Sequence, residues 1–489
     1  MAYNNSVEVF RDNEYPMMKG NVYLDHAGTT VYSKTLVEQF SAKMVANLYG
    51  NPHSGSYPAK LSGHMVDAVR EEALQFLGAD PEHFELVFTA NTTAAIKLVA
   101  ESFRDLALAS SVAKTFWYGY HKDSHTSLVG VREYAEGSSH CFSSDEEVEN
   151  WLQGRESPKT LSNASGIPGL FAYPGQSNMT GRRLPFSWTR QLRQSFHQDT
   201  YSLLDAAALA TTAQLDFSDP EFAPDFTVVA FYKIFGFPDL GALIVRKQSS
   251  YILSWRKYFG GGTVDMLTVL HEPTVKRKDA TIHDGLEDGT LPFHSIMALG
   301  CAISDHKRLY GSMKTVSQHT SFLVQRLYVG LSKLSYSNGR PLCAIYHDSV
   351  PGKNPYSDPT TQGATIAFSV MTADGTYVEH SQVEKLASEK GIYLRSGGLC
   401  NPGGIASSLD IKPWQFKRAW AAGCNCGNST PFRGKPIGVV RASLGAMSTM
   451  GDVDLFLYFL FETFVAEPTK NSPESLDTNG FQTSMEVKG

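Results

Sequence analysis

Short apolar segments alternate with amphipathic helical segments over residues 20–320, and this alternation constrains the fold more than any other feature of the sequence. Strands that are separated by helices usually pair in parallel, with the helices packed on the faces of the sheet. We therefore predict an α/β fold built on a large, mostly parallel sheet. The apolar spacing predicts helices at 34–48 and 57–77 and strands at 22–25, 85–89, 202–206, 227–233 and 241–247.

The pattern of the chain changes near residue 330. Segments 364–370 and 439–445 are predicted to be strands, and segments 383–390 and 452–466 to be helices, which is typical of a smaller α+β domain. After Pro468 the sequence becomes polar, as in disordered tails. The predicted order is an N-terminal arm, a large domain, a small domain and a disordered tail, at 1–20, 21–325, 326–467 and 468–489.

The composition excludes several classes of protein. Because 42% of the 489 residues are hydrophobic and 19% are charged, the chain as a whole is not disordered, and a net charge of −6 gives no attraction to nucleic acid or to an anionic membrane. The six cysteines form no CxxC pair, so neither a disulfide scaffold nor a metal site is predicted. The start has no signal-peptide pattern, and the apolar run at 455–461 is far shorter than the ~20 residues of a membrane span. We expect a soluble, cytoplasmic protein.

Two residues at predicted strand ends suggest a particular cofactor. Asp205 ends an apolar strand, and Lys233 follows another, so both side chains are expected at the edge where parallel strands end. Pyridoxal phosphate (PLP) needs this pair: a lysine that attaches it covalently and an acid that keeps its ring nitrogen protonated. Taken singly, however, each residue is equally compatible with a solvated lysine and an ordinary turn aspartate.

Two further segments would complete such a site. TANTTAAIK at 89–97 places small residues, including Thr92 and Thr93, at the start of a helix, where free N–H groups and the helix dipole attract phosphate. His125 is suited to stacking on a cofactor ring. The alternatives are a plain helix cap and a structural histidine.

The second half of the chain adds two candidates for substrate chemistry. Arg441 lies on a predicted strand and is suited to a bidentate grip on a carboxylate. Cys400 lies in a segment rich in Gly and Pro (394–404), and a cysteine on a mobile, polar loop is a candidate nucleophile.

Taken together, these segments resemble the class V, fold-type I PLP enzymes, whose large sheet has seven strands. Within them the sequence is most similar to the amino-terminal domain of the molybdenum cofactor sulfurases, relatives of the cysteine desulfurases. FYKIFGFP and YFGGGTV are specific to this branch. The matching segments run in the family's order: YLDHAGTT (23–30), YGNPHS (49–54), FTANTTAAIKL (88–98), HTSLVGVRE (125–133), PGQSNMTGRR (174–183), LLDAAALATT (203–212), FYKIFGFPDLGALIVRK (231–247), YFGGGTV (258–264), LEDGTLPF (286–293), LRSGGLCNPGG (394–404) and VRASLG (440–445).

The resemblance implies a role for each matched residue that faces the cofactor. Lys233 would carry PLP covalently, Asp205 would pair with the ring nitrogen, and His125 would stack on the ring. Asn178 would form a hydrogen bond with the ring hydroxyl. The phosphate would be held by Thr93 and its neighbour Thr92.

For the substrate, the resemblance implies that Arg441 binds the α-carboxylate of cysteine. Lys233 would remove the α-proton, and the thiolate of Cys400 would take the substrate sulfur as a persulfide while alanine leaves. Thr290 would reach the phosphate bound by a partner subunit, which implies a homodimer.

Three departures from the family pattern bear on function. A serine that helps to hold the phosphate is replaced by Ala230, and Gly398 and Ile405 stand where the family commonly has further cysteines. Cys424 and Cys426 have no role that we can derive. Complete molybdenum cofactor sulfurases continue into a carboxy-terminal domain for which this chain has no room. We therefore expect either a separate sulfur acceptor or recruitment to another reaction.

Three hypotheses follow. The first is a PLP-dependent cysteine desulfurase that passes sulfur to a protein or cofactor acceptor. The second is a PLP-dependent C–S lyase that cleaves a cysteine conjugate by β-elimination and needs Lys233 but not Cys400. The third is a non-catalytic partner protein with the same fold.

Overall fold

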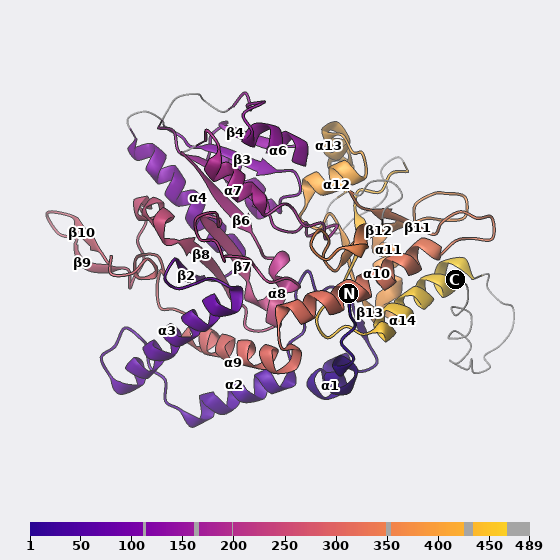
Figure 1. Cartoon of the computed structure of the whole chain (residues 1–489), viewed down its shortest axis with the longest axis horizontal. Helices are drawn as coiled ribbons and strands as arrows, with labels where there is room; N and C mark the ends of the chain where they lie inside the picture. The colour runs from indigo at the N-terminus through magenta and orange to yellow at the C-terminus, as the bar shows by residue number, and fades with distance from the viewer. Residues whose placement is uncertain (111–113, 161–165, 198, 349–353, 425–433, 467–489) are drawn as a thin grey trace.

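The computed structural model describes residues 1–110, 114–160, 166–197, 199–348, 354–424 and 434–466. The predicted tail at 468–489 and Cys426 lie outside these residues. A seven-stranded sheet and a four-stranded sheet organise the described chain, and they lie in different parts of the molecule (Figure 1). Among the described residues, no helix is long and apolar enough to cross a membrane.

The large sheet confirms the predicted α/β architecture. Neighbouring strands are parallel except for β8, which runs antiparallel to both β2 and β7. The segment from 231 to 240 joins β7 to β8, and it is too short for the crossover of a dozen or more residues that a parallel pair needs. Across the sheet the strands are β2 (Phe84–Thr89), β8 (Gly241–Arg246), β7 (Phe226–Ala230), β6 (Thr200–Asp205), β5 (Gly169–Pro174), β3 (Trp117–His121) and β4 (Ser139–Phe142).

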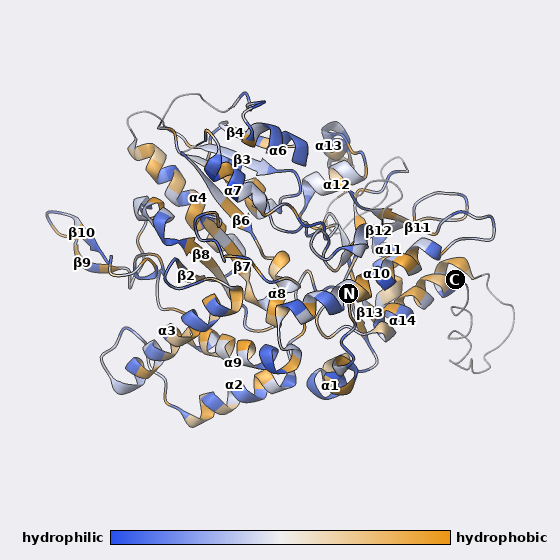
Figure 2. Cartoon of the chain, in the orientation of Figure 1, coloured by the Kyte–Doolittle hydropathy of each residue, from blue (hydrophilic) through white to orange (hydrophobic). Residues whose placement is uncertain are grey.

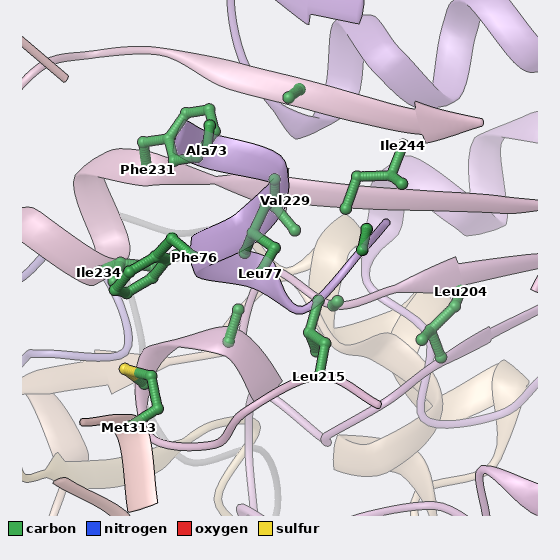
Figure 3. Packing of buried hydrophobic residues seen from close by; sticks show 14 of the residues in the cluster. Ala73, Phe76, Leu77, Leu204, Leu215, Val229, Phe231, Ile234, Ile244 and Met313 are labelled. Carbon is green, nitrogen blue, oxygen red and sulfur yellow. The ribbon is translucent and has the colours of Figure 1, made fainter. Parts of the chain in front are cut away.

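Helices cover both faces of this sheet, because side chains of successive strand residues point to opposite faces. Val229 and its neighbours Leu204 and Ile244 pack against α3 (Tyr57–Leu77), as Figure 3 shows. The adjacent residues of the same strands, such as Val228, pack against α4 (Thr92–Ala109) on the other face. Figure 2 shows the result: apolar strands between helices that are apolar on one side only.

The four-stranded sheet is antiparallel and supports a second core. Its order is β11 (Cys343–Tyr346), β12 (Thr365–Val370), β15 (Val439–Ser443) and β14 (Arg395–Gly397). Helices α10 (Met313–Lys333), α11 (His380–Glu389) and α14 (Met450–Leu460) contribute buried side chains to this core. The start of α10 packs in the large-sheet core and its end in the second one, so the predicted boundary at 325/326 falls inside this helix.

Several predicted elements differ from the structure at their ends. The strand predicted at 22–25 is reduced to β1 (Val22–Tyr23), which pairs with β13 (Ile392–Tyr393). The strand predicted to run to 233 is wrong at its end, because β7 stops at Ala230. The remaining elements are α1 (Ser6–Glu14), η1 (Pro16–Met18), α2 (Lys34–Ala46), α5 (Thr126–Val129), η2 (Gly130–Glu133), α6 (Asp145–Leu152), α7 (Ser187–Gln194), η3 (Leu209–Thr211), α8 (Phe231–Phe235), η4 (Lys247–Trp255), β9 (Val264–Thr268), β10 (Thr274–Arg277), η5 (His283–Gly285), α9 (Phe293–Tyr310), η6 (Pro355–Ser357), α12 (Pro402–Ser408), α13 (Pro413–Ala421) and η7 (Phe461–Val465).

Candidate active site

A cavity of about 220 Å³ lies where β5 and β6 end, beside the start of α4 and beside α8. Six of the residues that the sequence predicts for the site line it together: Thr92, Thr93, His125, Asn178, Asp205 and Lys233. Cys400, Arg441 and Thr290 do not line it. The lining also includes Ser127, Gln176 and Tyr232, which the sequence analysis did not single out.

Asp205 and Lys233 reach the cavity from neighbouring parallel strands. Asp205 is the last residue of β6, and its Oδ1 accepts a hydrogen bond from Ala207 N at 3.0 Å. Lys233 lies in α8, which begins directly after β7. Burial lowers the pKa of the Lys233 amine, while the Asp205 carboxylate partly counteracts this by raising it. Lys233 is therefore neutral at a lower pH than an ordinary lysine, as a nucleophile or base requires.

The pKa of His125 is lowered for similar reasons. Burial lowers the pKa of its imidazole, the Asp205 carboxylate raises it, and Lys233 and Arg395 lower it further. Its Nδ1 accepts a hydrogen bond from Ser127 N at 3.1 Å, which requires an unprotonated Nδ1. The ring is therefore held uncharged at the cavity wall.

The start of α4 provides groups for an anion. The Asn91 side chain caps Ala94 N at 3.0 Å, so the amides of Thr92 and Thr93 stay outside this cap. Thr92 Oγ1 is buried without a hydrogen-bond partner among the described residues. Thr93 Oγ1 lies 2.8 Å from Ser127 Oγ. A phosphate would satisfy the buried hydroxyl and the free amides.

These residues fit PLP. The helix start offers donors for its phosphate, Asp205 offers a carboxylate for its ring nitrogen, and Lys233 offers an amine with a lowered pKa for its aldehyde. Ala230 is fully buried and does not line the cavity. Ser127 offers a hydroxyl beside Thr93, which is suited to replace the donor that the family's serine provides.

One glycine sets the distance between β8 and this helix start, and it gives a testable prediction. A Cβ on Gly241 would lie 2.6 Å from Asn91 C and 2.9 Å from Thr92 N, both backbone atoms. Gly241→Ala is therefore expected to displace the phosphate donors and to weaken PLP binding about tenfold, which corresponds to one charged hydrogen bond of about 1.5 kcal/mol. Titration of the cofactor-free protein with PLP measures this. Gly130→Ala is the control, since a Cβ there meets nothing within 4 Å. Equal affinities for G241A and wild type would contradict the prediction.

Arg441 is already paired in the structure. It is 2% exposed on β15, and it donates to Asp25 Oδ1 at 2.5 Å and to Asn178 O at 2.9 Å. Its Nε has no hydrogen-bond partner among the described residues. Asp25 belongs to the YLDHAGTT segment, whose role the sequence did not reveal. Any carboxylate bound by Arg441 would have to share the guanidinium with Asp25.

Arg395 is a second cation near the cavity, and the sequence analysis missed it. It is exposed on β14, and its register partner on β15 is Arg441. Burial is the main cause of the lowered pKa of Arg441, and the charge of Arg395 adds to it. No ion pair of Arg395 exists within the described part of the chain. The sequence does not show that these two arginines face each other, because it does not give the register of the two antiparallel strands.

Cys400 lies beside the cavity wall in a turn whose carbonyls are hydrogen-bonded, and the mobility predicted for this segment stays a prediction. The cysteine is exposed, but its carbonyl accepts from Thr126 N at 2.9 Å, next to His125. The carbonyl of Leu399 accepts from Asn178 Nδ2 at 2.7 Å. Leu399 and Cys400 both have a φ of +53°, a left-handed conformation that costs non-glycine residues of the order of 1 kcal/mol each. The two hydrogen bonds offset this cost.

Thr290 is exposed and lies apart from the cavity of its own chain. Its Oγ1 is 3.5 Å from Asn51 Nδ2. Gly289 N donates to Gly261 O at 2.7 Å, so three of the family segments quoted above meet here: YGNPHS, YFGGGTV and LEDGTLPF.

The comparisons with known proteins place the chain in a family. The sequence model of the family described as aminotransferase class-V matches residues 22–456, so the chain belongs to the aminotransferase class-V family. Within that family, it is 53% identical over 476 residues to the molybdenum cofactor sulfurase of Botryotinia fuckeliana (strain B05.10). The match covers 96% of this chain and 57% of that protein, so the chain spans just over half the length of this relative.

Solved structures support the fold. The apo structure of a cysteine desulfurase from Thermococcus onnurineus NA1 has a TM-score of 0.69 at 17% identity, covering 94% of this chain and 98% of that one. A variant of C-DES with glycine covalently linked to its PLP cofactor has a TM-score of 0.64 at 14% identity, covering 92% and 98%. The predicted fold-type I architecture is confirmed.

Proposed function

We propose that this chain is a PLP-dependent cysteine desulfurase of the molybdenum cofactor sulfurase type. It would take sulfur from L-cysteine onto Cys400 and pass it to a protein or cofactor acceptor. The observation that carries the proposal is the cavity itself, in which half-buried Lys233 and buried Asp205 lie beside a helix start with free donors, while the Cys400 turn is hydrogen-bonded to the cavity wall.

When bound, PLP supplies a ring that accepts the electrons released as the substrate's α-proton is removed. Lys233 would attach the cofactor and then take that proton, because its lowered pKa makes the neutral, basic form more accessible than in an ordinary lysine. Asp205 would hold the ring nitrogen protonated, and His125 would cover the ring. Thr92 and Thr93 would hold the phosphate.

Cys400 would act on the substrate sulfur. Its thiolate forms the S–S bond as the substrate's C–S bond breaks, so that L-cysteine and Cys400 become alanine and a Cys400 persulfide. The substrate carboxylate would be held by Arg441, helped by the unpaired charge of Arg395. An exposed cysteine on an anchored turn favours this reaction over β-elimination, which has no use for Cys400.

We further propose a homodimer in which Thr290 completes the phosphate site of the partner subunit. The exposure of Thr290 and its separation from its own cavity support this role. The domain organisation and the cytoplasmic location predicted from the sequence stay predictions.

Replacement of Cys400 tests the proposal. With PLP and L-cysteine, the wild type is expected to form alanine and a persulfide on Cys400. C400A is expected to lose alanine formation by a factor of at least about 10² while it keeps its PLP, because the nucleophile does not contact the cofactor site. Alanine release, persulfide labelling and PLP absorbance measure these three quantities.

Cys141→Ala is the matched control, since Cys141 is also exposed but lies on the edge strand β4. It should behave as wild type. Formation of pyruvate and ammonia at equal rates by wild type and C400A would identify a C–S lyase. A protein that neither binds PLP nor turns over L-cysteine would be the non-catalytic partner of the third hypothesis.

A further inference from the structure

One buried carboxamide joins the Cys400 turn to the cavity. Asn401 has no exposed surface, although it directly follows an exposed cysteine. Its Nδ2 donates to Asn178 Oδ1 at 2.9 Å and to Asp123 O at 3.1 Å, and its Oδ1 accepts from Gly404 N at 2.9 Å. Both Nδ2 hydrogens are therefore in use.

The backbone determines how both carboxamides are oriented. Gly404 N can only donate, so the atom of Asn401 that faces it is the oxygen. Leu399 O can only accept, so the atom of Asn178 that faces it is the nitrogen. The two side chains then meet as a donor from Asn401 and an acceptor on Asn178, which is the only complementary arrangement.

This orientation has a consequence inside the cavity. Asn178 lines the cavity, and its oxygen is occupied by Asn401. One Nδ2 hydrogen goes to Leu399 O, so the second is the group that Asn178 can offer to a ligand. The wall therefore presents a donor, suited to an anionic oxygen.

Asn401 also fixes the turn that carries Cys400. The bond to Asp123 O ties it to the segment before α5, where Thr126 N holds Cys400 O. The bond from Asn178 to Leu399 O holds the other side of the turn. The left-handed pair Leu399–Cys400 is thus held by Asn178, which Asn401 contacts, and by Thr126, which lies three residues after Asp123, the other residue that Asn401 Nδ2 contacts.

We propose that Asn401 is a positioning residue that builds the cavity wall and the sulfur-accepting turn as one unit. It orients Asn178 toward the cofactor and holds Cys400 at a fixed place beside the cavity. This inference rests on the proposed function for the sulfur step, whereas its structural part concerns the protein alone.

The test is Asn401→Asp, which keeps the size of the side chain and the oxygen that caps Gly404 N. The second oxygen cannot donate to Asn178 Oδ1 or Asp123 O, so both bonds are lost.

In the full-length protein without PLP, amide exchange in peptides covering 123–129 and 398–404 is expected to rise at least about tenfold. With PLP, kcat for alanine formation should fall about 10–100-fold with KM within about twofold, because misplaced reacting groups slow the chemistry. The absorption band of bound PLP should shift as Asn178 reorients.

Asn354→Asp is the control, because Asn354 caps η6 through Tyr356 N at 2.9 Å, with no contact to the cavity. It should change neither exchange in the two peptides nor kcat. If N401D does not accumulate as folded protein, Asn401→Ser replaces it, since the hydroxyl can cap α12 but cannot reach Asn178. Unchanged exchange and unchanged kcat in the tested variant would overturn the inference. An equal rise of amide exchange in all peptides would also overturn it. Failure of the wild type to form a persulfide would instead overturn the proposed function. The exchange result would still decide whether Asn401 holds the Cys400 turn and the cavity wall together.

Discussion

Lys233→Ala is expected to lose covalent retention of PLP and to reduce alanine formation from L-cysteine by at least about 10³-fold. Lys233 is the lysine that lines the cavity, and the position of α8 directly after β7 brings it opposite Asp205. Its removal takes away both the attachment point and the base, and a positioned base alone contributes about 10²–10⁴. Reduction with borohydride followed by peptide mapping should find a pyridoxyl group on Lys233 in the wild type and on no peptide of K233A.

The matched control is Lys97→Ala, which removes an exposed lysine from α4 and leaves the first turn of that helix intact. It should retain PLP and turn over cysteine as the wild type does. K233A should still bind PLP reversibly, because the phosphate donors and Asp205 remain. A pyridoxyl group on another lysine of the wild type, or undiminished turnover by K233A, would contradict the assignment.

The sequence predicted the parts of the site that depend on strand topology. Asp205 and Lys233 end or follow parallel neighbours, and parallel strands place their carboxyl ends at one edge. The start of α4 was visible because helix caps have a local signature, and the helix predicted at 57–77 matches α3, because its apolar spacing covers the whole element.

The contacts that complete the site could not be predicted, because they join distant parts of the chain. Arg441 and Asp25 are 416 residues apart, and Asn178 and Leu399 are 221 residues apart. Gly and Pro around Cys400 suggested a mobile loop, but they did not reveal that the side chain of Asn401 beside it is buried. The antiparallel direction of β8, by contrast, could have been predicted, because the strands predicted at 227–233 and 241–247 leave too few residues between them for a parallel crossover.

Burial and charge together lower the pKa of both bases at the cavity, Lys233 and His125. Burial lowers the pKa of both Lys233 and His125, and Arg395 lowers both further. Asp205 is the group that opposes this in both cases. Arg441 also lowers the pKa of Lys233, and Asp25, which pairs with Arg441, raises it. Of the charges around the cavity, Asp205 therefore has the largest effect on both Lys233 and His125.

Asp205→Asn is expected to reduce alanine formation about 10²–10³-fold, comparable to the loss of one charge-stabilising group in an active site. The amide keeps the size of the side chain, and its oxygen can still accept from Ala207 N, so the fold should persist. It cannot hold the ring nitrogen protonated by charge, so the electron-accepting capacity of bound PLP falls. The sign of the accompanying pKa change follows from the cause: without the carboxylate the cationic amine is less stabilised, so the pKa of Lys233 falls further below that of ordinary lysine.

Two measurements separate these effects. In the cofactor-free protein, the pH midpoint for reductive methylation of Lys233 should be lower in D205N than in the wild type, and with PLP the loss should be in kcat. Asp239→Asn is the control, because Asp239 is exposed on the α8–β8 connection and does not line the cavity. A Lys233 midpoint that rises or stays fixed in D205N would contradict the stabilising effect of Asp205 on the charged amine. In that case Asp205 would act on the cofactor ring alone.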